Sequence, residues 1–202
     1  MSELTIFKQC LLTEAKAIID TVNNFGDEVI EAIKLIQNTK GHVVITGVGK
    51  SGHVGEKIAA SMASTGTPAF FMHATEGVHG DLGMITENDC VIMISNSGET
   101  KELLNLLPSL EKMGVKKISL TRNHESTLAK ACDVSLAYKY VREADDLGLA
   151  PTVSSTLTLA VGDALAVTLS KLKGFRPEDF HLYHPGGSLG KMLEKKWFRW
   201  VY

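Results

Sequence analysis

Five short apolar runs, separated by segments with helical spacing, are the feature that most constrains the fold of this chain. The runs are "HVVITG" (42–47), "PAFFMH" (68–73), "CVIMIS" (90–95), "KISLT" (117–121) and "VSLAY" (134–138). Runs that are apolar at nearly every position are typical of strands buried on both faces, as in parallel sheets covered by helices. The pattern therefore predicts an α/β fold with a five-stranded parallel sheet.

The segments around these runs have the periodicity expected of helices. Between the runs, helices are expected at 51–64, near 75–80, at 99–113 and at about 125–131. Outside them, helices are expected at 3–24, 27–38 and 154–172. With 202 residues, 44% of them hydrophobic, the chain can bury the core of one domain. We therefore expect a three-layer α/β/α sandwich with two N-terminal helices prefixed to it.

Two polar loops are expected to share one pocket. In open parallel sheets, ligands bind beyond the carboxyl ends of the strands, where the strand order reverses. In the flavodoxin-like order 2-1-3-4-5, this point lies between the first and third strands. The loops that leave these strands are "GVGKSG" (47–52) and "SNSGET" (95–100), and both open a helix.

The loop "GVGKSG" has part of two nucleotide-binding motifs. A P-loop requires a glycine where this chain has Val44, and no strand ends in an aspartate for Mg²⁺. A dinucleotide-binding G-x-G-x-x-G motif is followed by an acidic residue after the second strand, which here ends in Met72-His73-Ala74-Thr75. The plain alternative is a glycine turn with a solvated lysine. We favour anion binding, because Lys50 and Ser51 begin a helix.

The loop "SNSGET" carries more donors than a helix cap requires. A cap alone would use Ser97, with Glu99 complementing the helix dipole. Ser95, Asn96 and Thr100 add further polar side chains. A phosphate monoester takes several converging donors, which hydroxyls and helix-start N–H groups supply. We therefore expect this loop to bind phosphate.

Three other polar segments supply candidate acid, base and binding groups. The loop "HATEGVHGDLG" (73–83) holds two histidines, His73 and His79, that could act as acid/base groups or metal ligands. No HExxH or paired CxxC motif supports a metal site, so metal catalysis is not expected. The segment "READDLGLAPTVSST" (142–156) contributes Glu143, and "FHLYHPGGSLGK" (180–191) contributes His184. Each segment, taken alone, could be an ordinary loop.

Composition excludes several classes of partner. The formal net charge is −2 and no Lys/Arg run stands out, so neither nucleic acid nor a membrane surface is an expected partner. The N-terminus lacks the pattern of a signal peptide, and no apolar run is expected to reach membrane-spanning length. Three widely spaced cysteines fit a reducing compartment. We expect a cytoplasmic protein.

The order of "GVGKSG", "HGDLG", "SNSGET", "LAPTVSST" and "HPGGSLGK" resembles the sugar isomerase (SIS) domain, and more closely the D-arabinose 5-phosphate isomerase family. The resemblance covers about residues 5 to 193, with Tyr183 where the family often has phenylalanine. It implies interconversion of D-arabinose 5-phosphate and D-ribulose 5-phosphate through an enediolate, in the supply of the eight-carbon acid sugar Kdo for lipopolysaccharide or capsule. It implies no cofactor.

The resemblance also assigns residues to roles. The catalytic positions are Lys50, Glu102, Glu143 and His184. The substrate-binding positions are Ser51, Gly66, Thr67, His79, Ser95, Ser97 and Thr100. His73 matches a position associated with inhibitory zinc. These assignments imply that the ligand is a small phosphorylated sugar.

The resemblance further implies a homotetramer with sites shared between subunits. It places a SIS domain at 1–193 and a tail of unknown role at 194–202, without the CBS pair that many members carry. Two alternatives stay open. One is a SIS isomerase of another sugar phosphate, and the other is a non-catalytic sugar-phosphate-binding module.

Overall fold

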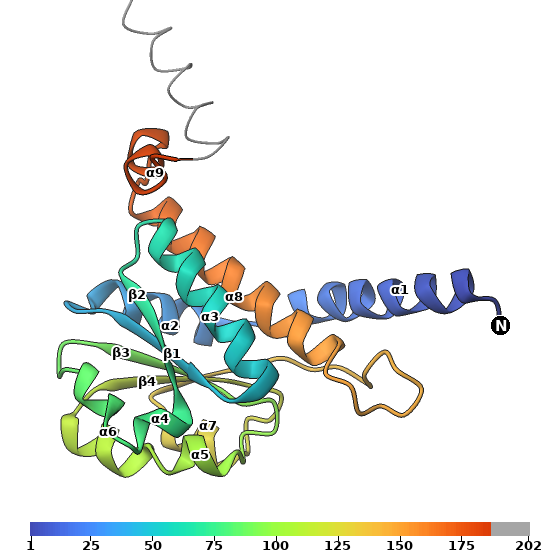
Figure 1. The fold of residues 1–202 in the computed structure, drawn as a ribbon, viewed down its shortest axis with the longest axis horizontal. Coiled ribbons are helices and arrows are strands. Elements are labelled where there is room, and N and C mark those ends of the chain that lie inside the picture. The colour runs from blue at the N-terminus through green and yellow to red at the C-terminus, as the bar shows by residue number, and fades with distance from the viewer. Residues whose placement is uncertain (187–202) are drawn as a thin grey trace, which may run out of the picture.

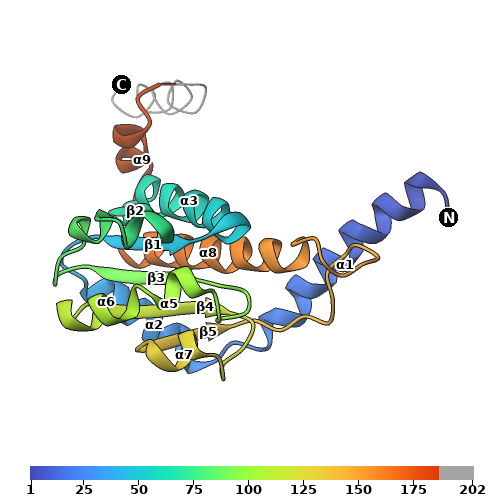
Figure 2. The ribbon, with the colours of Figure 1, turned by 60° about the horizontal axis from the view of Figure 1, so that its bottom comes forward.

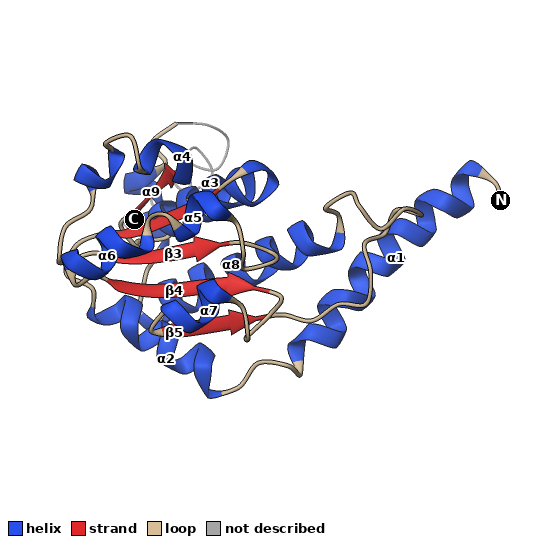
Figure 3. Cartoon of the chain, turned by 90° about the horizontal axis from the view of Figure 1, so that it is seen from below, coloured by secondary structure: helices blue, strands red, loops and turns tan. Residues whose placement is uncertain are grey.

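The computed structural model describes residues 1–186 and contains one five-stranded sheet in the order β2-β1-β3-β4-β5. All neighbouring strands run parallel, as Figure 3 shows. The strands are β1 (Val43–Gly47), β2 (Ala69–His73), β3 (Cys90–Ile94), β4 (Lys116–Thr121) and β5 (Val134–Ala137). The predicted parallel sheet and its strand order are therefore confirmed.

Side-chain alternation along the central strands divides the core into two apolar layers. On β1, Val43 and Ile45 join one buried cluster, and Val44 joins the other. This alternation follows from the pleat, because successive side chains point to opposite faces of a strand. Both faces are covered by helices, which is why nearly every strand position is apolar.

The first layer of helices contains α2 (Asp27–Asn38), α3 (Gly49–Ser64) and α8 (Val153–Leu172), which contribute to the larger cluster. The other face carries α4 (Ala74–Gly77), the 3₁₀ helix η1 (Asp81–Met84), α5 (Lys101–Leu104), α6 (Leu107–Met113) and α7 (Thr127–Ala131). Figure 1 shows these two layers on either side of the sheet. The expected three-layer α/β/α sandwich is confirmed.

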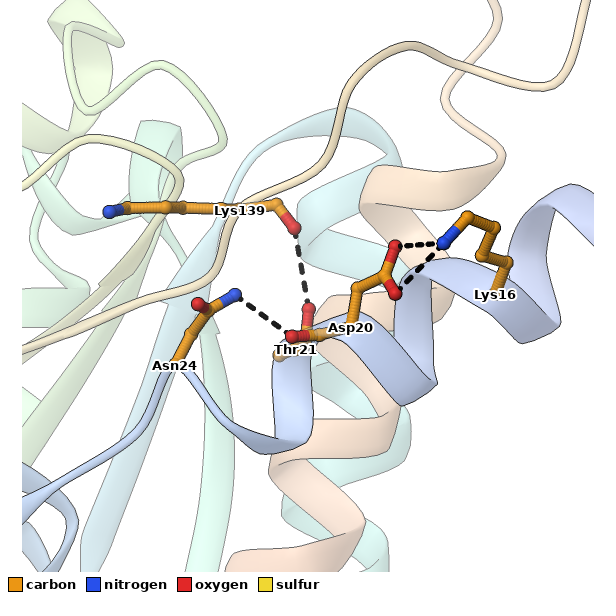
Figure 4. Close-up of polar contacts among 5 residues, drawn as sticks. All are labelled: Lys16, Asp20, Thr21, Asn24 and Lys139. Carbon is orange, nitrogen blue, oxygen red and sulfur yellow. Dashed lines mark hydrogen bonds and ion pairs between the residues drawn. The ribbon is translucent and has the colours of Figure 1, made fainter.

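Helix α1 (Glu3–Val22) projects away from the sandwich, as Figures 1 and 2 show. Its C-terminal half is tied to the body where Thr21 Oγ1 donates to the Lys139 carbonyl at 3.4 Å (Figure 4). Thr156 Oγ1 adds a hydrogen bond to Glu14 at 3.1 Å. The N-terminal half exposes five large apolar side chains, namely Leu4, Ile6, Phe7, Leu11 and Leu12.

Two helical segments differ from the sequence prediction. The helix expected at 99–113 is broken into α5 and α6, because Pro108 lies in the first turn of α6 and cannot donate a backbone hydrogen bond to the preceding turn. Helix α9 (Pro177–Tyr183) was not predicted. It begins with Pro177, and Asp179 accepts a hydrogen bond from the Arg176 backbone N–H at 2.9 Å.

Helix α8 is apolar because it lies in the core. By length and composition, with 20 residues and a mean hydropathy of 1.4, it could cross a membrane, so the sequence prediction of no such run is wrong for α8. Half of the most apolar 18-residue stretch of α8 is buried inside the protein. It packs on α3, and a side chain at Gly162 would collide with Ile58. This packing identifies a buried core helix.

Candidate active site

A polar pocket of about 380 Å³ lies at the carboxyl edge of the sheet. It is formed by the start of α3, the loops after β3, β4 and β5, and the start of α8. Its polar lining residues are Lys50, Ser51, Asn96, Arg122, Tyr138, Tyr140, Glu143, Ser154, Ser155 and Thr158. "GVGKSG" and "SNSGET" both contribute to this lining, so the prediction that the two loops share one pocket is confirmed.

Lys50 and Ser51 reach the pocket from the first turn of α3. The chain turns sharply between β1 and α3, with Gly49 at a φ of +59° that favours glycine. Unpaired N–H groups at the start of a helix favour an anion nearby. Lys50 is exposed and adds a full positive charge to this side of the pocket.

Glu143 is a buried carboxylate held by donors on both oxygens. Its Oε2 accepts hydrogen bonds from the backbone N–H and the hydroxyl of Thr152, at 2.9 and 3.1 Å, and from the backbone N–H of Ser154 at 3.1 Å. Its Oε1 accepts a hydrogen bond from the Tyr140 hydroxyl at 3.0 Å. Burial opposes ionisation, but the hydrogen bonds from Ser154, Thr152 and Tyr140 outweigh it and lower the pKa of Glu143. Glu143 is therefore an anion at neutral pH.

Arg122, Tyr138 and Tyr140 belong to the pocket but were not predicted from the sequence. Arg122 follows β4, and its guanidinium carbon lies 5.1 Å from the centroid of the Tyr140 ring. The amide of Asn96 donates to the Tyr140 hydroxyl at 2.9 Å, and its carbonyl oxygen accepts from Tyr138 at 3.3 Å. Their position in the sequence could have indicated them, because each of these residues lies within three residues of the end of β4 or β5.

The predicted phosphate-binding hydroxyls lie in the "SNSGET" loop but do not line the pocket themselves. Ser95 is buried and its hydroxyl lies 2.7 Å from that of Thr100. Ser97 Oγ accepts the backbone N–H of Glu99 at 3.1 Å, and Glu99 Oε1 accepts the backbone N–H of Thr127 at 2.7 Å. The loop is thus held by its own polar groups, and its binding of phosphate stays a prediction.

Three predicted residues lie on the β2 and β3 side of the same sheet edge, outside the pocket. His73 ends β2, and its Nδ1 accepts the backbone N–H of Thr75 at 3.3 Å. His79 and Glu102 are exposed, in the loop before η1 and in the first turn of α5. Within residues 1–186, no group of three or more His, Cys, Asp or Glu side chains is arranged to hold a metal ion.

Gly66, Thr67 and His184 lie at the other end of α8 from the pocket. The pocket is at the start of α8, and α9 follows the C-terminus of α8 (Figure 1). Since α8 has 20 residues, its two ends are about 30 Å apart. His184 directly follows α9, with its ring stacked on Phe180 and its Nδ1 2.9 Å from the Phe180 carbonyl oxygen. Gly66 and Thr67 both accept hydrogen bonds from Lys173 Nζ at 3.1 Å. Within one chain these three residues do not meet Lys50 and Glu143.

The pocket combines two cations, one buried anion and several hydroxyl groups. Lys50 and Arg122 can stabilise negative charge on a ligand. Tyr138, Tyr140, Ser154, Ser155 and Thr158 supply hydroxyl groups suited to a polyhydroxylated molecule. The arrangement fits a small, anionic, hydroxyl-rich ligand. The predicted end of the domain at residue 193 and the tail at 194–202 lie outside the described residues.

Comparison with known proteins agrees with this chemistry. Residues 35–168 match the model of a family described as the SIS domain. The arabinose 5-phosphate isomerase KdsD of Escherichia coli (strain K12) is 57% identical over 186 residues, which are 92% of this chain and 57% of that protein. The arabinose 5-phosphate isomerase KpsF of E. coli O6:H1 (strain CFT073) is 55% identical over 191 residues, which are 94% of this chain and 58% of that protein. The chain thus spans little more than half the length of these relatives.

A solved structure of similar length also matches. It is a protein of E. coli CFT073 in complex with arabinose 5-phosphate, with a TM-score of 0.89 and 52% sequence identity. The match covers 92% of this chain and all of that one.

Proposed function

Because the chain belongs to the SIS-domain family, we propose that it is an aldose–ketose isomerase that interconverts D-arabinose 5-phosphate and D-ribulose 5-phosphate. The observation that carries the proposal is the pocket in which Lys50 and Arg122 accompany the buried carboxylate of Glu143. The 57% identity to an arabinose 5-phosphate isomerase narrows the substrate. The arabinose 5-phosphate bound to a structure 52% identical to this chain supports the same choice.

The reaction moves a proton between C1 and C2 of the sugar through an enediolate. It needs a base, a group that stabilises the developing negative charge and an acid/base group that opens the sugar ring. In our proposal Lys50 and Arg122 stabilise the enediolate or the phosphate. His79 serves ring opening or contacts a sugar hydroxyl. The protein's own groups perform these steps, and no cofactor is assigned.

The proton transfer is assigned to His184 in preference to Glu143. Four hydrogen bonds already hold the Glu143 carboxylate and lower its pKa, which weakens it as a base. Imidazole titrates near neutral pH and suits a proton shuttle. Glu102, in the first turn of α5, stays a second candidate. Glu143 then acts as a fixed anion of the site.

The phosphate is assigned to the hydroxyl loop and to the start of α3. Ser95, Ser97 and Thr100 lie directly after β3, and Ser51 lies in the first turn of α3. These two segments flank the same strand-order reversal. Holding the phosphate there would fix the positions of C1 and C2 beside the acid/base groups.

We further propose a homotetramer in which one subunit completes the site of another. His184, Gly66 and Thr67 are remote from Lys50 within one chain, so a site that uses all four must combine two chains. The exposed apolar half of α1 offers surface that such an assembly would bury. Mixing an inactive Lys50→Ala variant with an inactive His184→Asn variant, and reassembling them, should restore part of the activity. Failure of mixed assemblies to regain activity would contradict shared sites.

The substrate is tested by incubating the protein with pentose, hexose and heptose phosphates and measuring ketose or aldose product. We expect turnover of arabinose 5-phosphate in preference to the other sugars. Faster turnover of a hexulose or heptose phosphate would favour a different SIS isomerase. Binding without turnover of any sugar phosphate would favour a sugar-phosphate-binding module. The role in Kdo supply and the cytoplasmic location stay predictions.

A further inference from the structure

The hydroxyl group of Tyr140 connects three polar residues of the pocket. It donates a hydrogen bond to Glu143 Oε1 at 3.0 Å and accepts one from Asn96 Nδ2 at 2.9 Å. Arg122 Nη1 also donates to it, at 3.4 Å, and the Arg122 guanidinium lies over its ring. These residues come from loops after β3, β4 and β5, so this one hydroxyl joins three separate segments.

The two oxygens of Glu143 differ in how much acceptor capacity they keep. Oε2 accepts three hydrogen bonds from Thr152 and Ser154, which fill its side at the start of α8. Among the described residues, Tyr140 is the donor that the structure gives to Oε1. Oε1 accepts one hydrogen bond where Oε2 accepts three, so Oε1 keeps acceptor capacity for a sugar hydroxyl. The orientation of this oxygen therefore depends on Tyr140.

We propose that Tyr140 is a positioning residue that fixes Glu143 Oε1 and the Arg122 guanidinium relative to each other across the pocket. The inference rests on the proposed isomerase function. It adds a residue that holds the charged groups of the pocket in place to the residues already assigned to catalysis and binding. A cation and a carboxylate on mobile side chains would tend to pair directly. The Tyr140 hydroxyl and ring give each of them a separate contact and keep both available to the substrate.

Tyr138 provides a matched comparison. It is also a tyrosine of this pocket, two residues earlier, but its hydroxyl lies against Thr158 at 3.0 Å and Asn96 at 3.3 Å. It makes no hydrogen bond to Glu143 among the contacts of residues 1–186. Tyr138→Phe and Tyr140→Phe remove the same atom from the same wall, and only Tyr140→Phe releases Glu143 Oε1.

The expected pH effect has a definite sign. The charged or titratable groups that face Glu143 are Lys50 from α3, Arg122 after β4, and Tyr138 and Tyr140 after β5, while α8 contributes uncharged donors. A donor to the carboxylate favours its ionised form, so removing the Tyr140 hydroxyl raises the pKa of Glu143. If catalysis uses the anion, the acid limb of the kcat/KM profile moves to higher pH.

The experiment compares wild type, Tyr140→Phe and Tyr138→Phe by kcat, KM and pH profile with arabinose 5-phosphate. We expect Tyr140→Phe to lower kcat/KM by about 10- to 100-fold, the effect of losing a hydrogen bond to a charged group. We expect its acid limb to move upward by about one pH unit. Tyr138→Phe should leave the acid limb in place. Equal shifts in both variants, or none in either, would overturn the role of Tyr140.

A double-mutant cycle with Glu143→Gln separates positioning from folding. If Tyr140 acts through Glu143, Tyr140→Phe should have a much smaller effect in the Glu143→Gln background. If turnover of Glu143→Gln is too slow to measure, the coupling is calculated from the Kd for arabinose 5-phosphate of the wild type, the two single variants and the double variant. Additive effects would overturn the proposal. An inactive wild-type protein would instead refute the isomerase function, which distinguishes the two failures.

Discussion

Glu143 caps the start of helix α8, where its Oε2 accepts the backbone N–H of Ser154 at 3.1 Å. Thr152 donates to the same oxygen through its backbone N–H and its hydroxyl. The first backbone N–H groups of a helix have no hydrogen-bond acceptor within the helix. The Glu143 carboxylate supplies this acceptor for N–H groups that would otherwise be buried without a hydrogen bond. One residue therefore stabilises the core helix and supplies the negative charge of the pocket.

Replacing Glu143 should make the stability of the protein less sensitive to acid. Hydrogen bonds lower its folded pKa, so its stabilisation is present above the unfolded pKa and is lost as pH falls through the folded value. We expect Glu143→Gln to lower the free energy of unfolding by about 1–3 kcal/mol at pH 7. The difference from wild type should narrow below about pH 4. Urea unfolding at both pH values measures this.

Asp89→Asn is the control for the unfolding experiment with Glu143→Gln, because it removes a carboxylate of lowered pKa that lies away from the pocket. Asp89 lies at the opposite edge of the sheet, where its carboxylate accepts backbone N–H groups of His42 at 2.6 Å and Thr86 at 2.7 Å. Burial opposes its ionisation, but these hydrogen bonds outweigh burial and lower its pKa. We expect Asp89→Asn to lose acid-sensitive stability but keep kcat. A stability difference for Glu143→Gln that stays constant with pH would contradict the capping role of its charge.

Ser97→Ala tests the phosphate assignment of the hydroxyl loop. Loss of one hydrogen bond weakens binding by about 0.5–1.5 kcal/mol, or about twice that with a charged partner. We expect a higher KM for arabinose 5-phosphate and little change in the affinity for unphosphorylated arabinose. The measurement is a pair of titrations with the two sugars. Equal losses for both would mean that Ser97 only holds the turn through the Glu99 N–H.

His184→Asn tests the proton transfer. A positioned acid/base group contributes about 10²- to 10⁴-fold to the rate, so kcat should fall by that factor with little change in KM. Sedimentation of the variant shows whether its assembly is intact. A kcat within a few-fold of wild type would transfer the role to Glu102 or Glu143. An assembly that dissociates into monomers would identify His184 as an interface residue.

Zinc inhibition tests the assignment of His73. We expect excess zinc to inhibit, because His73 ends β2 at the pocket edge of the sheet and imidazole binds zinc well. His73→Ala should raise the zinc concentration that halves the rate. The assay titrates zinc against both proteins at fixed substrate concentration. Unchanged zinc sensitivity in His73→Ala would show that the metal binds elsewhere.

The sequence predicts the scaffold of this protein better than its site. Uniformly apolar runs such as "CVIMI" identify buried parallel strands, because burial on both faces is reflected in local composition. The flavodoxin-like strand order, which the structure confirms, then places the reversal between the first and third strands. Pro108 carried the information that breaks the helix at 99–113, but the apolar periodicity around it concealed the break. Helix α9 was missed because its 7 residues are too few to show a helical periodicity.

Site residues contributed from several loops are harder to predict. Arg122 and Tyr140 are 18 residues apart and meet only when β4 and β5 pair. No local pattern marks either one as functional. Glu143 was predicted, but its capping of α8 depends on how the loop 138–152 folds back onto Thr152. His184 was also predicted, but the sequence pattern did not show that it lies far from Lys50. The structure places the pocket at the start of α8 and His184 beyond the end of this helix.

The most direct test of the central claim is an NMR measurement of the approach to equilibrium from both sugars, with protein stripped of metal by EDTA. We predict that arabinose 5-phosphate is converted into ribulose 5-phosphate, and the reverse, until both reactions reach the same mixture. Lys50→Ala should slow both directions, whereas Asp89→Asn should not. Absence of ribulose 5-phosphate from the forward reaction, or activity that appears only after a divalent metal ion is added, would contradict the account.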